Sequence, residues 1–255
     1  MLIGEGRSPL SAAGLMKRRL EVLEQLKNAP ENMKETYKAV MFSWWDNYFD
    51  TGDGAVRHSD GRLKVVPDAP YLRSWSPETQ LVDGAVPLSD DVYKGLEGEE
   101  FSAEQVERFF NKALSRRAAR EHPGRLALAR GDKALLGEFV DAAFAQAKER
   151  FKYDGDMMGV YHLVVPSEGA AGRLWFVARL LDLIYSSWAG GYDHLDDYDG
   201  RLVGVAPEAL DALRVLQAKD VSPLTVIVEQ AIRTAKPVQH GGGVILYVPS
   251  VQVRE

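Results

Sequence analysis

The sequence predicts a fold of the α/β or α+β class, with a small central sheet and packed helices. The run GVYHLVVP is rich in β-branched residues, which is typical of a buried strand, and it predicts a strand near 159–165. The apolar stretch at 174–188 follows the small turn SEGAAG and predicts a buried helix. Later strand-like runs at 201–205 and 244–249 predict two more strands of the same sheet.

Residues 1–50 are expected to form an N-terminal arm of two helices, at 10–28 and 30–48. The first helix has an apolar stripe, which consists of Leu15, Met16, Leu20, Leu23 and Leu26. Asn28 and Pro30 separate the two helices, because proline suits the first turn of a helix. This pattern predicts a helical hairpin.

Residues 51–101 are expected to form loops and β-hairpins with little helix. Asp-Gly pairs occur at 53–54, 60–61 and 83–84, and both residues tolerate the positive φ of tight turns. The run RLKVV at 62–66 predicts a strand in this segment.

Residues 102–255 are expected to form the main α/β core. Ser102 and Gln105 have the spacing of a capping box, which predicts a helix extending to about Arg120. Asp132 is expected to cap a second helix, which has an apolar stripe from Leu136 to Phe151.

Composition excludes several classes of protein. The chain has no cysteine, which excludes disulfides, thiolate metal sites and a cysteine nucleophile. A net charge of −6 argues against a general nucleic-acid-binding protein, which would usually be basic. The N-terminus lacks the pattern of a signal peptide, and no apolar run is long enough to span a bilayer. We therefore expect a soluble protein, in the cytoplasm or within a particle assembled inside the cell.

The turn at 167–172 is a candidate anion-binding site. Backbone amides at the start of a helix can bind a phosphate or carboxylate, so a helix after this turn would place Ser167, Gly169 and Gly172 at such a site. The turn lacks the complete glycine pattern of a dinucleotide site and the lysine of a P-loop. The alternative is that the two glycines allow close packing.

The acidic loop at 193–199 is a candidate site for a divalent cation. Asp193, Asp196, Asp197 and Asp199 provide carboxylates of the kind that Mg²⁺ or Ca²⁺ prefers. Their spacing does not match an EF-hand loop, so a solvated acidic loop is the alternative.

Adjacent tryptophans at 44 and 45 form a candidate interface. On a helix Trp44 and Trp45 point about 100° apart, so one of them can face away from the core and contact a partner. The alternative is that this helix packs on two sides.

Charge is distributed unevenly along the chain. Residues 83–107 are acidic, whereas 112–133 are basic and include the candidate interface residues Arg116, Arg117 and Arg120. These segments predict two solvated surfaces, or a head-to-tail contact between acidic and basic faces of identical subunits. The basic segment could also contact a phosphate backbone, although the overall acidity disfavours nucleic acid as a partner.

Two functions are compatible with these patterns. The first is a non-enzymatic structural or assembly subunit of a homo-oligomeric particle, for example one of virion type. The alternative is an α/β enzyme that binds a phosphate ligand at 167–172 and a divalent cation at 193–199. The sequence alone does not decide whether the protein is an enzyme.

Overall fold

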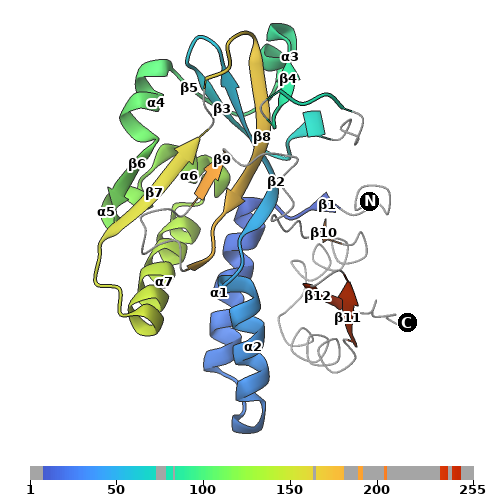
Figure 1. Ribbon diagram of the computed structural model, residues 1–255. Coiled ribbons are helices and arrows are strands. Elements are labelled where there is room, and N and C mark those ends of the chain that lie inside the picture. Colours follow the sequence, from blue (N-terminus) through green and yellow to red (C-terminus); the bar gives the residue numbers. More distant parts are fainter. Residues whose placement is uncertain are drawn as a thin grey trace, which may run out of the picture. The chain divides into compact units, whose positions relative to one another are not determined.

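The computed structural model describes residues 8–72, 79–82, 84–162, 165–180, 189–191, 204–205, 236–240 and 243–247 (Figure 1). The chain divides into two compact units, which are described separately. Residues 9–204 form the larger unit, and residues 1–8 with 205–255 form the smaller one. The larger unit therefore includes parts of all three segments expected from the sequence.

A helical hairpin begins the larger unit. Helix α1 (Ala12–Lys27) begins after Ser11, whose hydroxyl accepts a hydrogen bond from the Gly14 amide. A 3₁₀ turn (Glu31–Met33) leads into α2 (Lys34–Trp45), which packs against α1. The buried Arg19 guanidinium joins the hairpin to the rest of the unit by donating to the carbonyls of Trp44, Asn47 and Ala178. The predicted helical hairpin is confirmed.

The central sheet is mostly antiparallel, and its strands follow the order β5-β3-β2-β8-β9-β7-β6, with β4 beside β8 (Figure 1). Its strands in chain order are β2 (Phe49–His58), β3 (Leu63–Val66), β4 (Val86–Leu88), β5 (Glu99–Phe101), β6 (Lys112–Ser115), β7 (Met157–His162), β8 (Ala170–Val177) and β9 (Ala189–Gly191). Only the pair β7–β9 is parallel. The long central pair β2–β8 contains a bulge between Asp50 and Gly54.

Both faces of the central strands are covered. Successive side chains of a strand point to opposite faces, and Ala55 and Val56 accordingly belong to two different apolar clusters. The larger cluster lies between the sheet and α1, α2 and α7 (Lys133–Phe151), and includes Trp45, Phe139 and Trp175. The smaller one packs around Tyr71 and Tyr93.

Short helices connect the strands. They are the 3₁₀ turn η3 (Pro70–Leu72), α3 (Asp90–Gly95), α4 (Ala103–Phe109), α5 (Arg116–Arg120) and α6 (Pro123–Leu128). Ser102 and Gln105 form the predicted capping box, but α4 ends at Phe109 and β6 follows. Asp132 caps α7 as expected, because its carboxylate accepts the Leu135 amide. Within the described residues, no helix combines the length and apolarity needed to cross a bilayer.

Short strands lie at the boundary of the units and in the smaller unit. They are β1 (Ser8–Pro9), β10 (Gly204–Val205), β11 (Lys236–His240) and β12 (Gly243–Tyr247). Strands β11 and β12 form an antiparallel pair in which Val238 lies opposite Ile245. The predicted run at 244–249 thus lies largely in a strand, but this strand pairs with β11 in a sheet of two strands.

The mixed α+β class is confirmed, whereas the helix predicted from residue 174 is wrong over 174–177, because residues 170–177 form β8. Trp175, Phe176 and Val177 are all buried because this central strand is covered on both faces. A doubly buried strand lacks the alternation of apolar and polar residues that identifies a half-buried strand, so its sequence resembles a buried helix.

Candidate functional site

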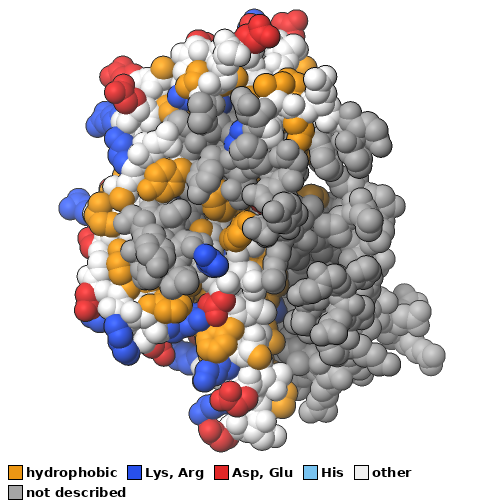
Figure 2. Space-filling model, in the orientation of Figure 1, with side chains coloured by type: hydrophobic (Ala, Val, Ile, Leu, Met, Phe, Trp, Pro, Cys, Tyr) orange, Lys and Arg blue, Asp and Glu red, His pale blue; other side chains and the backbone are white. Residues whose placement is uncertain are grey.

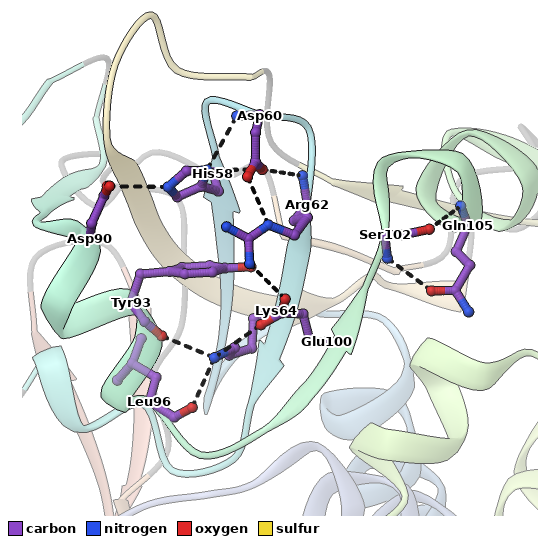
Figure 3. Close-up of polar contacts among 10 residues, drawn as sticks. All are labelled: His58, Asp60, Arg62, Lys64, Asp90, Tyr93, Leu96, Glu100, Ser102 and Gln105. Carbon is purple, nitrogen blue, oxygen red and sulfur yellow. Dashed lines mark hydrogen bonds and ion pairs between the residues drawn. The ribbon is translucent and has the colours of Figure 1, made fainter.

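An acidic surface lies on β5, α4 and the turn before them. We define it by five exposed carboxylates, which belong to Glu97, Glu99, Glu100, Glu104 and Glu107. The capping box that begins α4 fixes this surface, since the Ser102 amide donates to Gln105 Oε1 at 2.8 Å and the Gln105 amide donates to Ser102 Oγ at 3.2 Å (Figure 3). In the described sheet β5 pairs with β3 alone, so its other side is an edge.

Two basic side chains, Arg62 just before β3 and Lys64 within it, contact a carboxylate of the acidic surface. Arg62 Nη1 lies 2.8 Å from Glu100 Oε1, and Lys64 Nζ lies 3.2 Å from Glu100 Oε2 (Figure 3). Lys64 is buried and also donates to the carbonyls of Tyr93 and Leu96. Desolvation by burial acts to raise the pKa of Glu100, but hydrogen bonds and charges from Arg62 and Lys64 outweigh it and lower the pKa below its ordinary value.

A histidine between two carboxylates continues this network at the β2–β3 turn. His58 Nδ1 lies 2.8 Å from Asp60 Oδ1, and His58 Nε2 lies 3.2 Å from Asp90 Oδ1 on α3 (Figure 3). Arg62 Nε donates to Asp60 Oδ2 at 2.8 Å, which links the histidine to Glu100. The Asp60 amide also donates to His58 Nδ1, at 3.2 Å. The contact between His58 and Asp90 holds α3 against the hairpin formed by β2 and β3.

Tyr93 of α3 lies at the centre of this cluster. Its ring centroid is 4.9 Å from that of His58, 5.1 Å from the Arg62 guanidinium carbon and 4.6 Å from Lys64 Nζ. Burial, followed by the charge of Glu100, raises the pKa of Tyr93 to about 12. The phenol is therefore neutral at physiological pH, and its ring stabilises the two cations next to it.

A basic surface lies on β6 and α5. We define it by four exposed side chains, which belong to Lys112, Arg116, Arg117 and Arg120. Arg116 and Arg120 both pair with Asp141 of α7, at 2.8 Å and 3.2 Å. No ion pair joins Lys112 or Arg117 to another described residue. In the described sheet β6 pairs with β7 alone and forms the edge opposite to β5 in the strand order.

The acidic and basic surfaces adjoin each other. Helix α4 leads directly from the acidic edge to Lys112, and Figure 2 shows acidic side chains over α4 with basic side chains below them over β6 and α5. Phe101 of β5 and Phe110, just before β6, contact each other with ring centroids 5.2 Å apart. This contact lies between the end of β5 and the residues that lead into β6.

Comparisons with known proteins concern the fold. Neither a family model nor a curated protein sequence matches this chain. One solved structure matches with a TM-score of 0.50 and 16% sequence identity. Its description reads "Accommodation of massive sequence variation in Nanoarchaeota by the C-type lectin fold". The match covers 77% of this chain and 87% of that chain. In fold, the chain is similar to a C-type lectin domain.

The structure does not support the reason for expecting an anion at 167–172. Ser167 and Gly169 lie before β8 and Gly172 lies within it, so no helix begins after this turn. Gly169 has a φ of +60° and its carbonyl accepts the Ser59 amide, which fits a turn. A Cβ atom on Gly172 would lie 2.6 Å from the Tyr71 ring, so this glycine allows close packing.

The predicted cation site lies in a segment that the structure does not describe. Asp193, Asp196, Asp197 and Asp199 lie outside the described residues. Within the described residues no group of three histidines or carboxylates could hold a metal ion. A divalent cation at 193–199 stays a prediction.

The two tryptophans have different environments. Trp45 is completely buried, donates to the Arg19 carbonyl at 3.0 Å and stacks on Phe139, so it is not the tryptophan that can face away from the core. A tryptophan on the inner side of a helical hairpin fills the core. Trp44 is half-buried, with its ring stacked on Phe49.

The network of His58, Asp60, Arg62, Asp90 and Glu100 was not predicted from the sequence. Its only sequence signal is the RLKVV run, in which Arg62 and Lys64 are two residues apart and so share one face of a strand. The contacts His58–Asp90 and Arg62–Glu100 join residues that are 32 and 38 positions apart in the chain, beyond the range of a periodicity argument.

Proposed function

We propose that this chain is a non-enzymatic structural subunit that assembles with copies of itself. In this proposal the acidic surface of one copy binds the basic surface of another. The supporting observation is that exposed carboxylates on β5 and α4 adjoin exposed cations on β6 and α5, at two edges of the sheet.

Electrostatics favours this pairing over other edge contacts. Charged residues on edge strands usually prevent sheets from pairing with each other, and here two acidic edges or two basic edges would repel. An acidic edge and a basic edge attract, so the charges select one arrangement. When the acidic surface of each copy binds the basic surface of the next, the contact is head to tail and can build a ring or an open array.

The strength of such a contact is limited. An exposed ion pair contributes at most about 1 kcal/mol, and salt screens it. Met157, which is 40% exposed and opposite Ser115 in the register of β6 and β7, adds apolar area beside the basic surface. We expect weak pairwise association that becomes strong when many copies contribute, as in a homo-oligomeric particle of virion type.

The likeness to a C-type lectin fold supports a function located on the surface. The solved protein is described as accommodating massive sequence variation with this fold. A core that tolerates changes on its surface is suited to recognition by exposed residues. In this chain the residues of the acidic and basic surfaces lie on outer elements, whereas the central pair β2–β8 is covered on both faces.

A charge-reversal experiment tests the proposal. The acid-reversed variant Glu99→Lys/Glu104→Lys and the base-reversed variant Lys112→Glu/Arg117→Glu change only residues outside the ion pairs of Glu100 and Asp141. Each variant alone should be monomeric in light scattering at low salt. An equimolar mixture should associate again, because every acidic surface then meets a basic one.

A control matched to the acid-reversed variant is Glu24→Lys/Glu35→Lys. It makes the same change in net charge, but on α1 and α2, and should leave association intact. The wild-type complex should dissociate in about 0.5 M salt. A wild-type chain that is monomeric at every concentration and low salt would end the proposal. Binding of DNA that Lys112→Glu/Arg117→Glu abolishes would assign the basic surface to nucleic acid instead.

A further inference from the structure

Three Asp-Gly pairs lie within the described residues, at 53–54, 60–61 and 154–155. Such pairs can isomerise without an enzyme, because glycine has no side chain to hinder attack by its amide nitrogen on the carboxyl group of the preceding aspartate. The reaction needs an accessible carboxyl group, an amide without a hydrogen bond and a backbone that can rotate to bring them together. The contacts of each pair therefore decide its reactivity.

The pair Asp53–Gly54 is held in the core. Asp53 is fully buried, and its carboxylate accepts the Ala12 amide at 2.8 Å and pairs with Arg130 at 2.7 Å. Gly54 lies within β2, which is paired with β3 on one side and with β8 on the other. The carboxyl group cannot turn towards the Gly54 amide unless these contacts break, so this pair should be inert.

The pair Asp60–Gly61 lies at the surface, but hydrogen bonds hold both reacting groups. The Gly61 amide donates to the His58 carbonyl at 3.0 Å. The Asp60 carboxylate accepts from the backbone amide and from the guanidinium of Arg62, at 3.0 Å and 2.8 Å (Figure 3). Breaking three such bonds should slow the reaction at least about tenfold relative to a pair without them.

The pair Asp154–Gly155 has neither restraint. It lies between α7 and β7 in a segment without regular secondary structure, and both residues are exposed. The Asp154 side chain is 81% exposed, and its ion pair with Lys148, at 3.4 Å, is exposed as well. Within the described part of the chain, the Gly155 amide donates to no acceptor. The carboxyl group and the amide are therefore both available for the reaction.

The contacts on either side of this pair give its modification a structural consequence. The Asp156 carbonyl accepts the Arg116 amide at 2.9 Å, which joins this segment to the first turn of α5. Tyr153 Oη donates to the Met157 carbonyl at 3.2 Å, and a Cβ atom on Gly155 would clash with the Tyr153 ring. The main chain thus passes close to this ring, and an additional main-chain carbon would displace the residues that follow.

We propose that Asp154–Gly155 is a site of spontaneous isoaspartate formation, and that this modification weakens the contact between Asp156 and α5. The Gly155 nitrogen attacks the side-chain carboxyl carbon of Asp154, a C–N bond forms, and the amide proton leaves with the carboxyl hydroxyl as one water molecule. Water then cleaves the resulting ring at the bond between the main-chain carbonyl and the nitrogen. The main chain now passes through the side-chain carbons, and the former main-chain carbonyl is a free carboxylate.

The product has the same mass and charge as the original chain, and its main chain is longer by one carbon. The site does not depend on the self-association proposed above.

Peptide mapping of the full chain, after incubation at physiological temperature and pH, tests the site. An isoaspartate methyltransferase with a labelled methyl donor, followed by mass spectrometry of the peptides, measures the modified fraction at each pair. Labelling at 154–155 should exceed that at 60–61 at least about tenfold, and 53–54 should stay unlabelled. Equal labelling at 60–61 and 154–155, or no labelling at 154–155, would overturn the proposal.

Two variants of the exposed aspartate serve as matched controls. Asp154→Glu keeps the charge but would have to close a larger ring, so it should abolish the labelling at this position. Asp154→Asn releases ammonia, a better leaving group than water, and should increase the labelling. Labelling that is the same in all three proteins would show that it does not arise at this residue.

Amide exchange tests the effect on α5. After incubation, the Arg116 amide should exchange faster in the wild type, whereas in Asp154→Glu it should exchange at the rate of fresh protein. Unchanged exchange in wild-type protein that carries the isoaspartate would overturn this second part of the proposal.

Discussion

Arg62, just before β3, and Glu100 on β5 form an ion pair with 2.8 Å between Nη1 and Oε1, and this pair connects the edge strand β5 to the start of β3. Arg62 also donates to Asp60, which contacts His58 (Figure 3). The orientation of an exposed carboxylate therefore depends on a chain of contacts that ends at α3.

Replacing Arg62 should loosen β5 without unfolding the protein. Arg62→Met keeps the length of the side chain and removes both ion pairs. Because Arg62 and Glu100 are each about one-third exposed, we expect a loss below about 1 kcal/mol, together with faster amide exchange at Glu99 and Phe101. Arg18→Met, which removes an ion pair on α1, is the matched control. Unchanged exchange in β5 would show that the pair does not hold the edge.

Asp53 should be far more important for stability. Its buried carboxylate accepts the amides of Ala12 and Asp68 at 2.8 Å and 3.1 Å, and it pairs with Arg130 at 2.7 Å. Asp53→Asn removes the charge opposite Arg130 and weakens three contacts, so urea unfolding should show a loss of about 3 kcal/mol.

The control for Asp53 is Asp141→Asn, which removes a partly exposed carboxylate that also has arginine partners. This change should cost less than about 1 kcal/mol. Equal losses for the two variants would contradict the role assigned to Asp53.

His122 should make the protein less stable in acid. Desolvation of the buried ring, with the charge of Arg125, lowers the pKa of His122 to about 3, although the hydrogen bond of the ring to the Phe109 carbonyl acts to raise it. The unfolded state, with a pKa of about 6.5, then binds a proton that the folded state does not bind. Stability is complete above about pH 6.5 and falls as the pH drops towards 3, by about 2 kcal/mol at pH 5.

Urea unfolding at several pH values measures this effect. The variant His122→Asn retains a side-chain cap and should lose most of the slope between pH 6.5 and 4.5. His58→Asn, which changes a histidine at the β2–β3 turn, is the comparison. A slope that is the same in wild type and His122→Asn would rule out His122 as its source.

Glycine substitutions test the packing of β8. Gly172→Ala places a Cβ atom against the Tyr71 ring and should cost about 1–3 kcal/mol. Gly95→Ala at the end of α3 meets no atom within 4 Å and should be neutral or stabilising by up to about 1 kcal/mol. Thermal unfolding of both variants checks the contrast, and a neutral Gly172→Ala would disprove the close packing.

Local patterns predicted the elements with a regular period or a cap. The helical hairpin, the strand at 62–66 and the helix capped by Asp132 all have such signals, and all three are confirmed. Strand β8 had none, because Trp175, Phe176 and Val177 are buried on both faces and give no alternation.

Of the candidate site, only the separation of acidic and basic segments could be predicted from the sequence. The acidic and basic segments are visible in composition, and the structure places Arg116, Arg117 and Arg120 on a surface. The contacts of Arg62 with Glu100 and of His58 with Asp90 depend on strand order, which single-sequence periodicity does not specify.

The central pair β2–β8 has a consequence for synthesis on the ribosome. Thr51 Oγ1 donates to the Trp175 carbonyl across a sequence separation of 124 residues. At translation rates of about 5–20 residues per second, β2 is synthesised roughly 6–25 seconds before its partner β8. During that interval β2 can pair with β3 but its other side has no strand beside it, so a nascent chain stalled before residue 170 should be a substrate for chaperones.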